Sequence, residues 1–345
     1  EHKMDRNAVM STIALLSLLA SSTHSFSTII LSFNKQTTKA SRWGHSTTSS
    51  KLNALTERQL QFWEDVDNGL VDVEKFYSAK GQNIDRILEF TKSARGDIPP
   101  PKGVAPLHQP SEEHVKNLTA KPFWDTASDP DNFPWAAELE SQSQTIIDEF
   151  TSRLSEGGEL FTGDSSWQND VMGGGWSAVR LQRLGVWNVK NCEAFPKTYD
   201  LLRQLDIPLA VRGVCFARQA PGSGVAPHSD GRNFILTSHL GLKIPEGCWF
   251  KVGEETRGWN TGKLTTVDTS FEHSTENPSD EDRHVLIIDY WHPELTEAER
   301  AALEFVYNLR NEFESGKIPF RKVKRREEEG QGFAGLWSAL TGVGN

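Results

Sequence analysis

Cysteine and long hydrophobic runs are both scarce in this sequence of 345 residues. Only Cys192, Cys215 and Cys248 are present, with no CxxC pair, which excludes a disulfide framework and a cysteine-only zinc site. The apolar run at residues 12–20 is shorter than the roughly 20 residues of a membrane-spanning helix, so no stable membrane span is expected. Basic residues are also few: the chain has 37 Lys and Arg but 47 Asp and Glu, which gives a net charge of -10. This negative charge argues against a nucleic-acid partner.

Residues 1–53 have the composition of a targeting leader. No Asp or Glu occurs between Arg6 and Thr56, and half of residues 21–50 are Ser or Thr. Arg6 precedes the apolar run, as in a secretory signal, and the basic, hydroxyl-rich stretch behind it is typical of a transit peptide. We interpret the segment as a leader to a plastid, in the two-part algal form, or to the secretory pathway. A merely disordered extension is the alternative.

Two helical patterns precede a proline-rich segment. Thr56 and Gln59 form a capping box before one amphipathic stretch, and a second pattern covers residues 71–93, with Gly81 dividing it. We therefore predict a small helical appendage at residues 54–97. Residues 98–120 should form an extended linker, because the sequence IPPPKGVAPLHQP cannot continue a helix.

The main domain is predicted at residues 121–315 and should be mainly β with a few helices. Hydrophobic residues, 37% of the chain, suffice for a sizeable core. Short alternating segments predict strands at Val211–Arg218, Phe234–Ile244, Lys263–Asp268 and His284–Tyr290. A capping box at Thr296 begins a closing helix that ends at Gly316, and residues 316–345 are expected to form a tail with a short helix.

Three side chains with metal-binding chemistry lie in two short motifs. His228 and Asp230 are two residues apart, so in an extended segment they face the same way. His273 follows 45 residues after His228. Two His and one carboxylate on one side of a metal form the facial triad of non-haem Fe(II) oxygenases, which leaves positions open for a 2-oxo acid and O2. The guanidinium of Arg283 is planar and stays charged, so it is suited to paired hydrogen bonds with the distal carboxylate of such a co-substrate.

Plainer interpretations stand beside this one. An isolated His-x-Asp is more often a surface histidine bonded to a carboxylate, so the metal site depends on His273 and Arg283 at these spacings. His239 is either a buried core histidine or a second contact to the co-substrate, and its spacing favours the core. The turn at residues 277–280 predicts that His273 and Arg283 lie on or beside neighbouring antiparallel strands. His284 should point away from Arg283.

These segments together resemble the catalytic domain of the aspartyl/asparaginyl β-hydroxylase family of Fe(II)/2-oxoglutarate oxygenases. The similar pieces follow in the order PGSGVAPHSDGRN, SHLGLKIPEGC, DTSFEHSTEN, Arg283 and DYWHPELTEAER, with weaker similarity reaching back to residue 121. The resemblance implies a double-stranded β-helix, which is a cupin-like jelly-roll, with flanking helices. By motif match, His228 and His273 are Fe(II) ligands, completed by Asp230, and Arg283 binds 2-oxoglutarate.

Three further residues match positions that line the family's pocket. His239 matches the histidine of the HLGL motif beside the co-substrate, so the resemblance contradicts the core role that its spacing favours. Asn233 and Trp176 match other pocket-lining positions. The resemblance thus adds these three side chains to the site.

Departures from the family leave the substrate open. The animal protein hydroxylases carry Gly at the position of Asp230, and an arginine and a serine at the positions of Thr237 and Ala217. The predicted function is that of an Fe(II)- and 2-oxoglutarate-dependent dioxygenase that hydroxylates an aliphatic C–H. The favoured reaction is the β-hydroxylation of peptidyl aspartyl or asparaginyl residues. A small molecule or a lipid acyl chain is the alternative substrate. A non-catalytic jelly-roll that binds a metal or ligand is the alternative from another class.

Overall fold

The computed structural model describes residues 55–321, except residues 112, 158–159, 162–165 and 169–173. The predicted leader and nearly all of the predicted C-terminal tail lie outside this range. Within it, no helix has both the length and the apolar character needed to cross a membrane.

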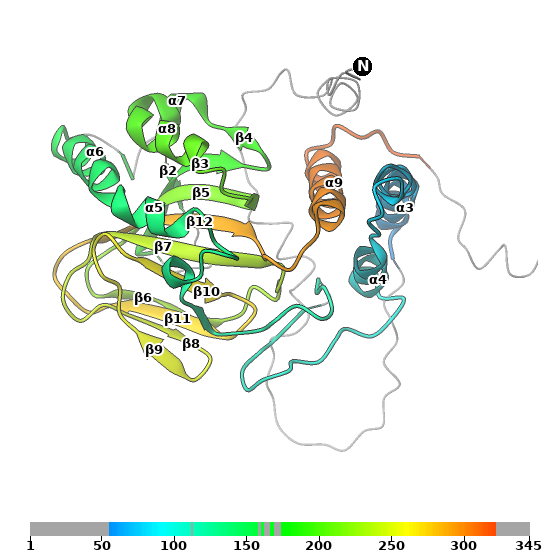
Figure 1. The fold of residues 1–345 in the computed structure, drawn as a ribbon, viewed down its shortest axis with the longest axis horizontal. Coiled ribbons are helices and arrows are strands. Elements are labelled where there is room, and N and C mark those ends of the chain that lie inside the picture. Colours follow the sequence, from blue (N-terminus) through cyan, green and yellow to red (C-terminus); the bar gives the residue numbers. More distant parts are fainter. Residues whose placement is uncertain (1–54, 112, 158–159, 162–165, 169–173, 322–345) are drawn as a thin grey trace, which may run out of the picture. The chain divides into compact units, whose positions relative to one another are not determined.

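Two antiparallel sheets face each other and form the predicted jelly-roll (Figure 1). In the described chain, the larger sheet has the strand order β1-β10-β7-β12-β5-β3-β2, with β4 paired to β3, and the smaller has the order β6-β11-β8-β9. The bounds in the larger sheet are β1 Phe123–Trp124, β2 Ser166–Gln168, β3 Trp176–Arg183, β4 Val186–Trp187, β5 Leu209–Gln219, β7 Ile235–Lys243, β10 Leu264–Asp268 and β12 Arg283–Trp291. Those in the smaller sheet are β6 Ser223–His228, β8 Trp249–Val252, β9 Glu255–Arg257 and β11 His273–Asn277. The four predicted strands correspond to β5, β7, β10 and β12.

Alternation along the strands divides the side chains of the larger sheet between two cores. Ala217 of β5 and Val285 of β12 face the smaller sheet and pack with Phe250 and Trp259. Phe216 and Leu286, one residue away in each strand, face the opposite side. Four helices cover that side, and their bounds are α5 Ala136–Ser141, α6 Ser143–Ser155, α7 Val189–Ala194 and α8 Pro196–Gln204. A short 3-10 helix, η1, spans Thr126–Ser128. The central strands are therefore buried on both faces.

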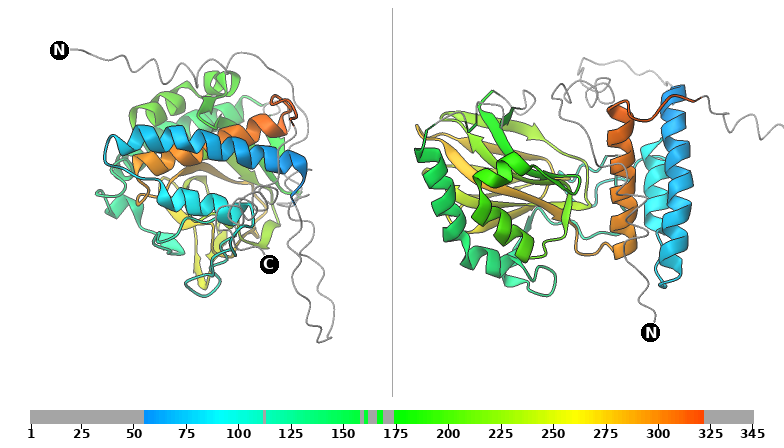
Figure 2. Two further views of the ribbon diagram at one scale, coloured as in Figure 1. Left: turned by 90° about the vertical axis from the view of Figure 1, so that its right-hand side faces the viewer. Right: turned by 90° about the horizontal axis from the view of Figure 1, so that it is seen from above.

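A third core joins the N-terminal helices to the closing helix. The bounds are α3 Glu57–Ser78, α4 Asp85–Ala94 and α9 Glu297–Glu314, and capping boxes at Thr56 and Thr296 begin α3 and α9 as predicted. Gly81, with φ of 74°, lies in the break between α3 and α4. Apolar residues of all three helices pack together and reach strand residues such as Ile235 and Trp291. Figure 2 shows α9 lying between the sheets and α3. The helices predicted as an appendage thus share a core with the jelly-roll.

The predicted linker is bonded to the loops of the jelly-roll. We call residues 104–111 and 113–118 the strap, which contains neither a helix nor a regular strand. Gln109 N–H donates to the Ser270 carbonyl (2.9 Å) and Glu272 N–H to the Leu107 carbonyl (2.8 Å). Ser111 N–H donates to the carbonyl of Gly231 (2.9 Å). These bonds fasten the strap to the segments around residues 231 and 271.

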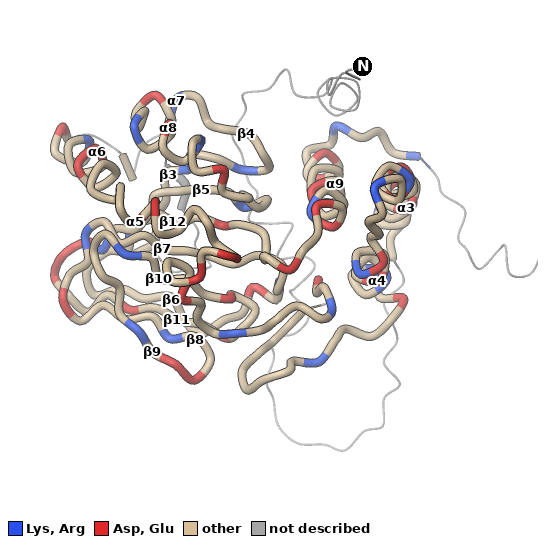
Figure 3. Tube along the Cα trace, in the orientation of Figure 1, with Lys and Arg blue, Asp and Glu red and all other residues tan. Residues whose placement is uncertain are grey.

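Charged residues of both signs occur along α3 and α9. Figure 3 shows basic and acidic positions interspersed on these helices rather than separated by sign. Some of them form ion pairs between elements, as Arg86 of α4 does with Glu299 of α9 at 2.6 Å. The third core is therefore reinforced at its edge by charge-assisted hydrogen bonds.

Candidate metal centre

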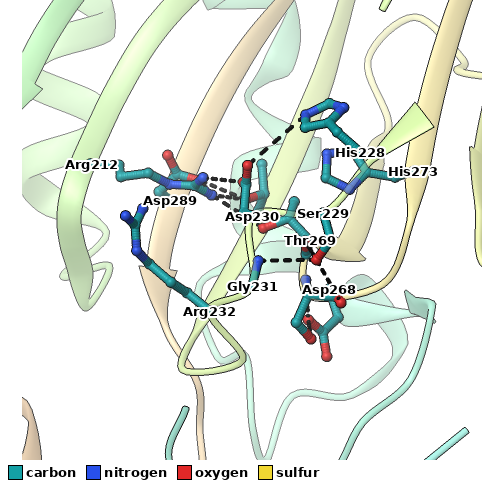
Figure 4. A network of polar contacts seen from close by, with 12 residues as sticks. Arg212, His228, Ser229, Asp230, Gly231, Arg232, Asp268, Thr269, His273 and Asp289 are labelled. Atoms are coloured by element: carbon teal, nitrogen blue, oxygen red, sulfur yellow. Dashed lines mark hydrogen bonds and ion pairs between the residues drawn. The ribbon is translucent and has the colours of Figure 1, made fainter. Parts of the chain in front are cut away.

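Three metal-ligating side chains converge at one end of β6 and β11. His228 ends β6, His273 begins β11, and the two residues are direct partners across this strand pair. Asp230 follows in the loop after β6. One ligand atom of each residue lies within 4.8 Å of the other two, a spacing that one metal ion can span (Figure 4). Within the described part of the chain, no other such group of His, Cys, Asp and Glu occurs.

Hydrogen bonds determine which nitrogen each histidine offers. Nδ1 of His228 lies 2.9 Å from the carbonyl oxygen of Ala226, and Nδ1 of His273 lies 2.9 Å from that of Phe271. A carbonyl oxygen only accepts, so each Nδ1 donates its proton and each Nε2 of the neutral ring keeps a free lone pair. Burial lowers the pKa of His273, which favours the neutral imidazole that a metal ion requires.

The Asp230 carboxylate is oriented by its backbone and by an arginine. Its N–H donates to the carbonyl of Thr269 (2.9 Å). Nη1 of Arg212 donates to Oδ2, while Oδ1 lies 4.0 Å from Nε2 of His228. Burial alone would raise the pKa of Asp230, but the charge of Arg212 lowers it below its ordinary value. The residue is therefore a carboxylate at neutral pH.

Arg212 belongs to the site although the sequence reasoning did not identify it. Its Nη2 donates to Oγ1 of Thr237 (2.8 Å) and to Oδ1 of Asp289 (3.0 Å). The Thr237 hydroxyl donates to the same Asp289 oxygen at 2.6 Å. Figure 4 shows the guanidinium between the carboxylates of Asp289 and Asp230.

The loop that carries Asp230 is held by Ser229. The Ser229 hydroxyl accepts from the N–H of Gly231 (3.0 Å) and donates to the Ser270 carbonyl (2.9 Å), and it also lies 3.1 Å from the Gln109 carbonyl of the strap. The Ser229 side chain thus joins three segments: the loop that carries Asp230, the segment before His273, and the strap.

A buried arginine lies between the two sheets. Arg283 begins β12 and is 2% exposed, and its Nε and Nη1 are buried without a hydrogen-bond partner in the described chain. Its guanidinium carbon lies 4.3 Å from the ring centroid of Trp259. Burial lowers the pKa of Arg283 to about 10, so the charge persists at neutral pH. The side chain thus presents a buried cation with free donors.

His239 shares Trp259 with Arg283. Nδ1 of His239 accepts a hydrogen bond from Nε1 of Trp259 (3.2 Å), and its ring stacks on Phe250 and Trp259. Burial, together with the positive charge of Arg283, keeps the pKa of His239 well below its ordinary value. The ring is therefore neutral with its proton on Nε2. The burial of His239 is consistent with a core histidine. Its contact with Trp259, which also contacts Arg283, is consistent with a place beside the co-substrate.

The two remaining predicted pocket residues lie in different surroundings. Trp176 begins β3 and is buried in the core between the two sheets, the core to which Trp259 also belongs. The Asn233 amide accepts from the Val115 N–H (2.9 Å) and donates to the Val115 carbonyl (2.7 Å). Both polar groups of Asn233 are thus bonded to the strap.

The predicted placement of His273 and Arg283 on neighbouring strands requires a correction. They begin the consecutive strands β11 and β12, but these strands belong to different sheets. The chain passes from the smaller to the larger sheet in the turn between β11 and β12, and the Asn277 side chain holds this turn. Its amide donates to the carbonyl of Glu281 within the turn and to the carbonyl of Gln219 in β5 of the larger sheet. His284 points away from Arg283, as expected, and packs near Phe150 and Phe161 on the helix-covered side.

The donor set fits the implied groups. Two Nε2 lone pairs and one carboxylate oxygen are the ligands of an Fe(II) facial triad, and they leave one side of the site open. The unpartnered buried donors of Arg283 would be satisfied by a carboxylate, which is the group that a dicarboxylic 2-oxo acid carries at its far end. Both observations concern side chains of this chain and agree with the chemistry that the motifs predict.

The fold and these residues define a jelly-roll protein with a candidate His-x-Asp…His metal site. Residues 140–293 match the family described as "Aspartyl/Asparaginyl beta-hydroxylase". This match confirms the predicted resemblance to that family over this segment.

Curated relatives are similar over the same part of the chain. The aspartyl/asparaginyl beta-hydroxylase of Mus musculus is 34% identical over 202 residues, which cover 58% of this chain and 27% of that protein. The human aspartate beta-hydroxylase domain-containing protein 2 is 32% identical over 175 residues, covering 49% of this chain and 47% of that protein. The chain thus spans about a quarter to a half of the length of these relatives.

Solved structures similar to this chain include cupin domains. A predicted oxalate decarboxylase from Thermotoga maritima is 16% identical, with a TM-score of 0.23, over 34% of this chain and 80% of that chain.

Proposed function

We propose that the protein is an Fe(II)- and 2-oxoglutarate-dependent dioxygenase that hydroxylates an aliphatic C–H. The observation that carries the proposal is the convergence of His228, Asp230 and His273 within 4.8 Å. The buried, unpartnered donors of Arg283 support the co-substrate. The names of the relatives, which are hydroxylases, support the reaction class.

Each residue has a defined task under this proposal. His228, His273 and Asp230 hold the metal, and the carbonyls of Ala226 and Phe271 keep both imidazoles in the tautomer that presents Nε2. Bound Fe(II), with 2-oxoglutarate and O2, supplies the oxidising equivalents that convert a C–H into a C–OH, with succinate and CO2 as the other products.

Side chains between the two sheets would orient the co-substrate. Arg283 pairs with its distal carboxylate, and Trp259 lies against the guanidinium of Arg283. Neutral His239 offers its Nε2 proton as a further donor. Apolar neighbours such as Phe250 and Val267 exclude water, which strengthens these polar contacts.

The first substrate to test is a peptidyl aspartyl or asparaginyl side chain, because the relatives are named for that reaction. A lipid acyl chain or a small molecule is the second candidate, because Thr237 is a departure from the animal protein hydroxylases near the site. In this structure its hydroxyl lies between Arg212 and Asp289, where the animal protein hydroxylases carry an arginine. The surroundings of the metal therefore differ from those of the animal enzymes.

The test measures binding before turnover. The purified protein is titrated with Fe(II) and then 2-oxoglutarate without O2, using tryptophan fluorescence, and succinate is measured after O2 is admitted with candidate peptides or a cell extract. Asp230→Ala should weaken metal binding about 10-fold or more, and His273→Ala further still. Asp282→Ala is the matched control, because Asp282 pairs with Arg218 at 2.9 Å and is similarly exposed, at 32% against 24% for Asp230.

The outcomes separate the two functional classes. Failure of the folded protein to bind both Fe(II) and 2-oxoglutarate contradicts the dioxygenase proposal. Metal binding without 2-oxoglutarate binding favours the non-catalytic jelly-roll. A product that gains one oxygen atom from O2, together with an equal amount of succinate, supports the hydroxylase.

A further inference from the structure

Arg212 lies behind the Asp230 carboxylate, on the side away from His228. We propose that Arg212 is a positioning residue for the metal centre, which holds Oδ2 of Asp230 and leaves Oδ1 as the single oxygen offered to the ion. The inference rests on the proposed function, because it requires that His228, Asp230 and His273 bind a metal.

The contacts of the two carboxylate oxygens differ. Nη1 of Arg212 donates to Oδ2 of Asp230, whereas Oδ1 lies 4.0 Å from Nε2 of His228, within the cluster of ligand atoms. Binding through both oxygens would require Oδ2 to give up a charge-assisted hydrogen bond. Arg212 thereby favours single-oxygen ligation. In an octahedral site this leaves three positions open, enough for a chelating 2-oxo acid and O2.

Arg212 is itself anchored by two strands of the larger sheet. Its Nη2 donates to Thr237 of β7 at 2.8 Å and to Asp289 of β12 at 3.0 Å. The same nitrogen lies 3.5 Å from the Thr269 hydroxyl. Asp289 Oδ1 also accepts from Thr237 at 2.6 Å, so this oxygen is engaged by two donors. The guanidinium fork therefore has one orientation, and Asp289 is kept from competing for the ion.

An irregularity in β5 brings Arg212 to this position. Val214 of β5 pairs with Ile288 of β12, and Leu209 pairs with Tyr290, so residues 210–213 stand opposite the single residue Asp289. Strict alternation would place Arg212 on the same face as Val214, which packs towards the helices. The bulge instead turns Arg212 towards Asp289 and the metal centre.

The test compares Arg212→Met and Arg212→Lys with a control on the same strand. Arg218 is 28% exposed, against 29% for Arg212, and it pairs with Asp282 away from the metal ligands, so Arg218→Met removes an equivalent ion pair. Co(II) binding is measured by calorimetry and by the visible absorption of the bound ion. We expect 10- to 100-fold weaker Co(II) binding and an altered spectrum in both Arg212 variants, with about unchanged values in Arg218→Met. Lysine should not restore binding, because one ammonium cannot make the paired contacts of the fork.

A double variant separates positioning from general damage. If Arg212 acts through Asp230, adding Arg212→Met to Asp230→Ala causes no further loss of Co(II) affinity. Thr237→Val is a milder variant that keeps both carboxylates and the arginine, and it should shift the Co(II) spectrum in the same direction. Wild-type Co(II) affinity and spectrum in Arg212→Lys and Thr237→Val overturn the inference, as does an equal loss with and without Asp230. Failure of the wild type to bind Co(II) would instead contradict the proposed function.

Discussion

Arg283 shows how one residue links binding to stability. Its charge is buried beside Trp259, with two nitrogens unpartnered within the described chain. Burying an uncompensated charge costs free energy in the folded state. A bound carboxylate would offset this cost, so the residue favours the occupied form of the protein.

Arg283→Met should therefore have opposite effects on stability and on 2-oxoglutarate binding. Without 2-oxoglutarate the variant should unfold at the same or a higher temperature than the wild type, because Met fills the site without a charge. Its affinity for 2-oxoglutarate should fall about 10- to 100-fold, the value of one or more charge-assisted hydrogen bonds. Thermal unfolding with and without 2-oxoglutarate measures both effects. An equal rise in melting temperature on adding 2-oxoglutarate to both proteins would contradict the assigned partner of Arg283.

Single residues also differ in how far the sequence could place them. His228 and Asp230 could be paired because residues two apart face the same way in extended chain, and His273 joined them because a facial triad requires a second imidazole. Arg212 could not be placed, because alternation puts it on the other face, and only the bulge reverses that. Gly213, whose φ is 74°, is the one local signal that β5 is not regular there.

At the scale of elements, Gly213 maintains the bulge in β5. An added Cβ would lie 2.2 Å from the backbone oxygen of Gln182, in a conformation that side chains rarely adopt. A non-glycine residue in the left-handed backbone conformation costs about 1–3 kcal/mol, and Gly213→Ala should lower the free energy of unfolding by more than this because of the added steric clash. The variant should also weaken metal binding, because it displaces Arg212. Gly185→Ala is the control, since Gly185 has φ of 75° and open space around it. Urea unfolding and Co(II) titration of both variants check this prediction.

The strap is the second element on which the site depends. A Cβ on Gly231 would lie 2.5 Å from Cβ of Ser111, so Gly231→Ala must move the strap or the ligand loop. We expect faster proteolysis within residues 98–118 and weaker Co(II) binding than in the wild type. Limited proteolysis with mass spectrometry and calorimetry test the two effects. Cleavage and affinity unchanged from the Gly185→Ala control would show that the strap does not support the metal centre.

The strap also marks a limit of the sequence prediction at this scale. Its proline content correctly indicated a segment without helix or regular strand. Composition carries no information about the hydrogen bonds from Gln109, Ser111 and Val115 to loops more than 100 residues away. The strands, by contrast, were predictable because their periodicity is local.

At the scale of the whole molecule, Glu113 joins three parts of the structure. It belongs to the strap, and its carboxylate pairs with Arg232 after the metal loop (2.7 Å) and with Arg310 of α9. The hydroxyl of Tyr307 donates to it at 2.7 Å. Burial alone would raise the pKa of Glu113, but the charges of Arg310 and Arg232 lower it below the ordinary value of 4.5.

Glu113→Gln should therefore change the response of the fold to acid. Ionised Glu113 stabilises the folded state above its ordinary pKa, and that contribution is lost as the pH falls towards its lowered value. The variant should be less stable than the wild type by about 3 kcal/mol at pH 7, because two buried arginine contacts lose their charge partner. The difference should shrink below pH 4.5. Urea unfolding across this range is the measurement, with exposed Glu193→Gln as control, and a difference independent of pH would contradict the argument.

The packing of α3 against α9 has a consequence for biosynthesis. Gly69 of α3 allows Phe305 of α9 to approach so closely that an added Cβ would lie 2.0 Å from the ring, and Val66 and Leu70 are fully buried in the same core. These are the first and last of the described helices. While the chain is being synthesised, α3 leaves the ribosome long before its partner exists, so its apolar face remains exposed until translation reaches α9. The nascent protein should therefore expose the apolar face of α3 to chaperones until translation has passed α9.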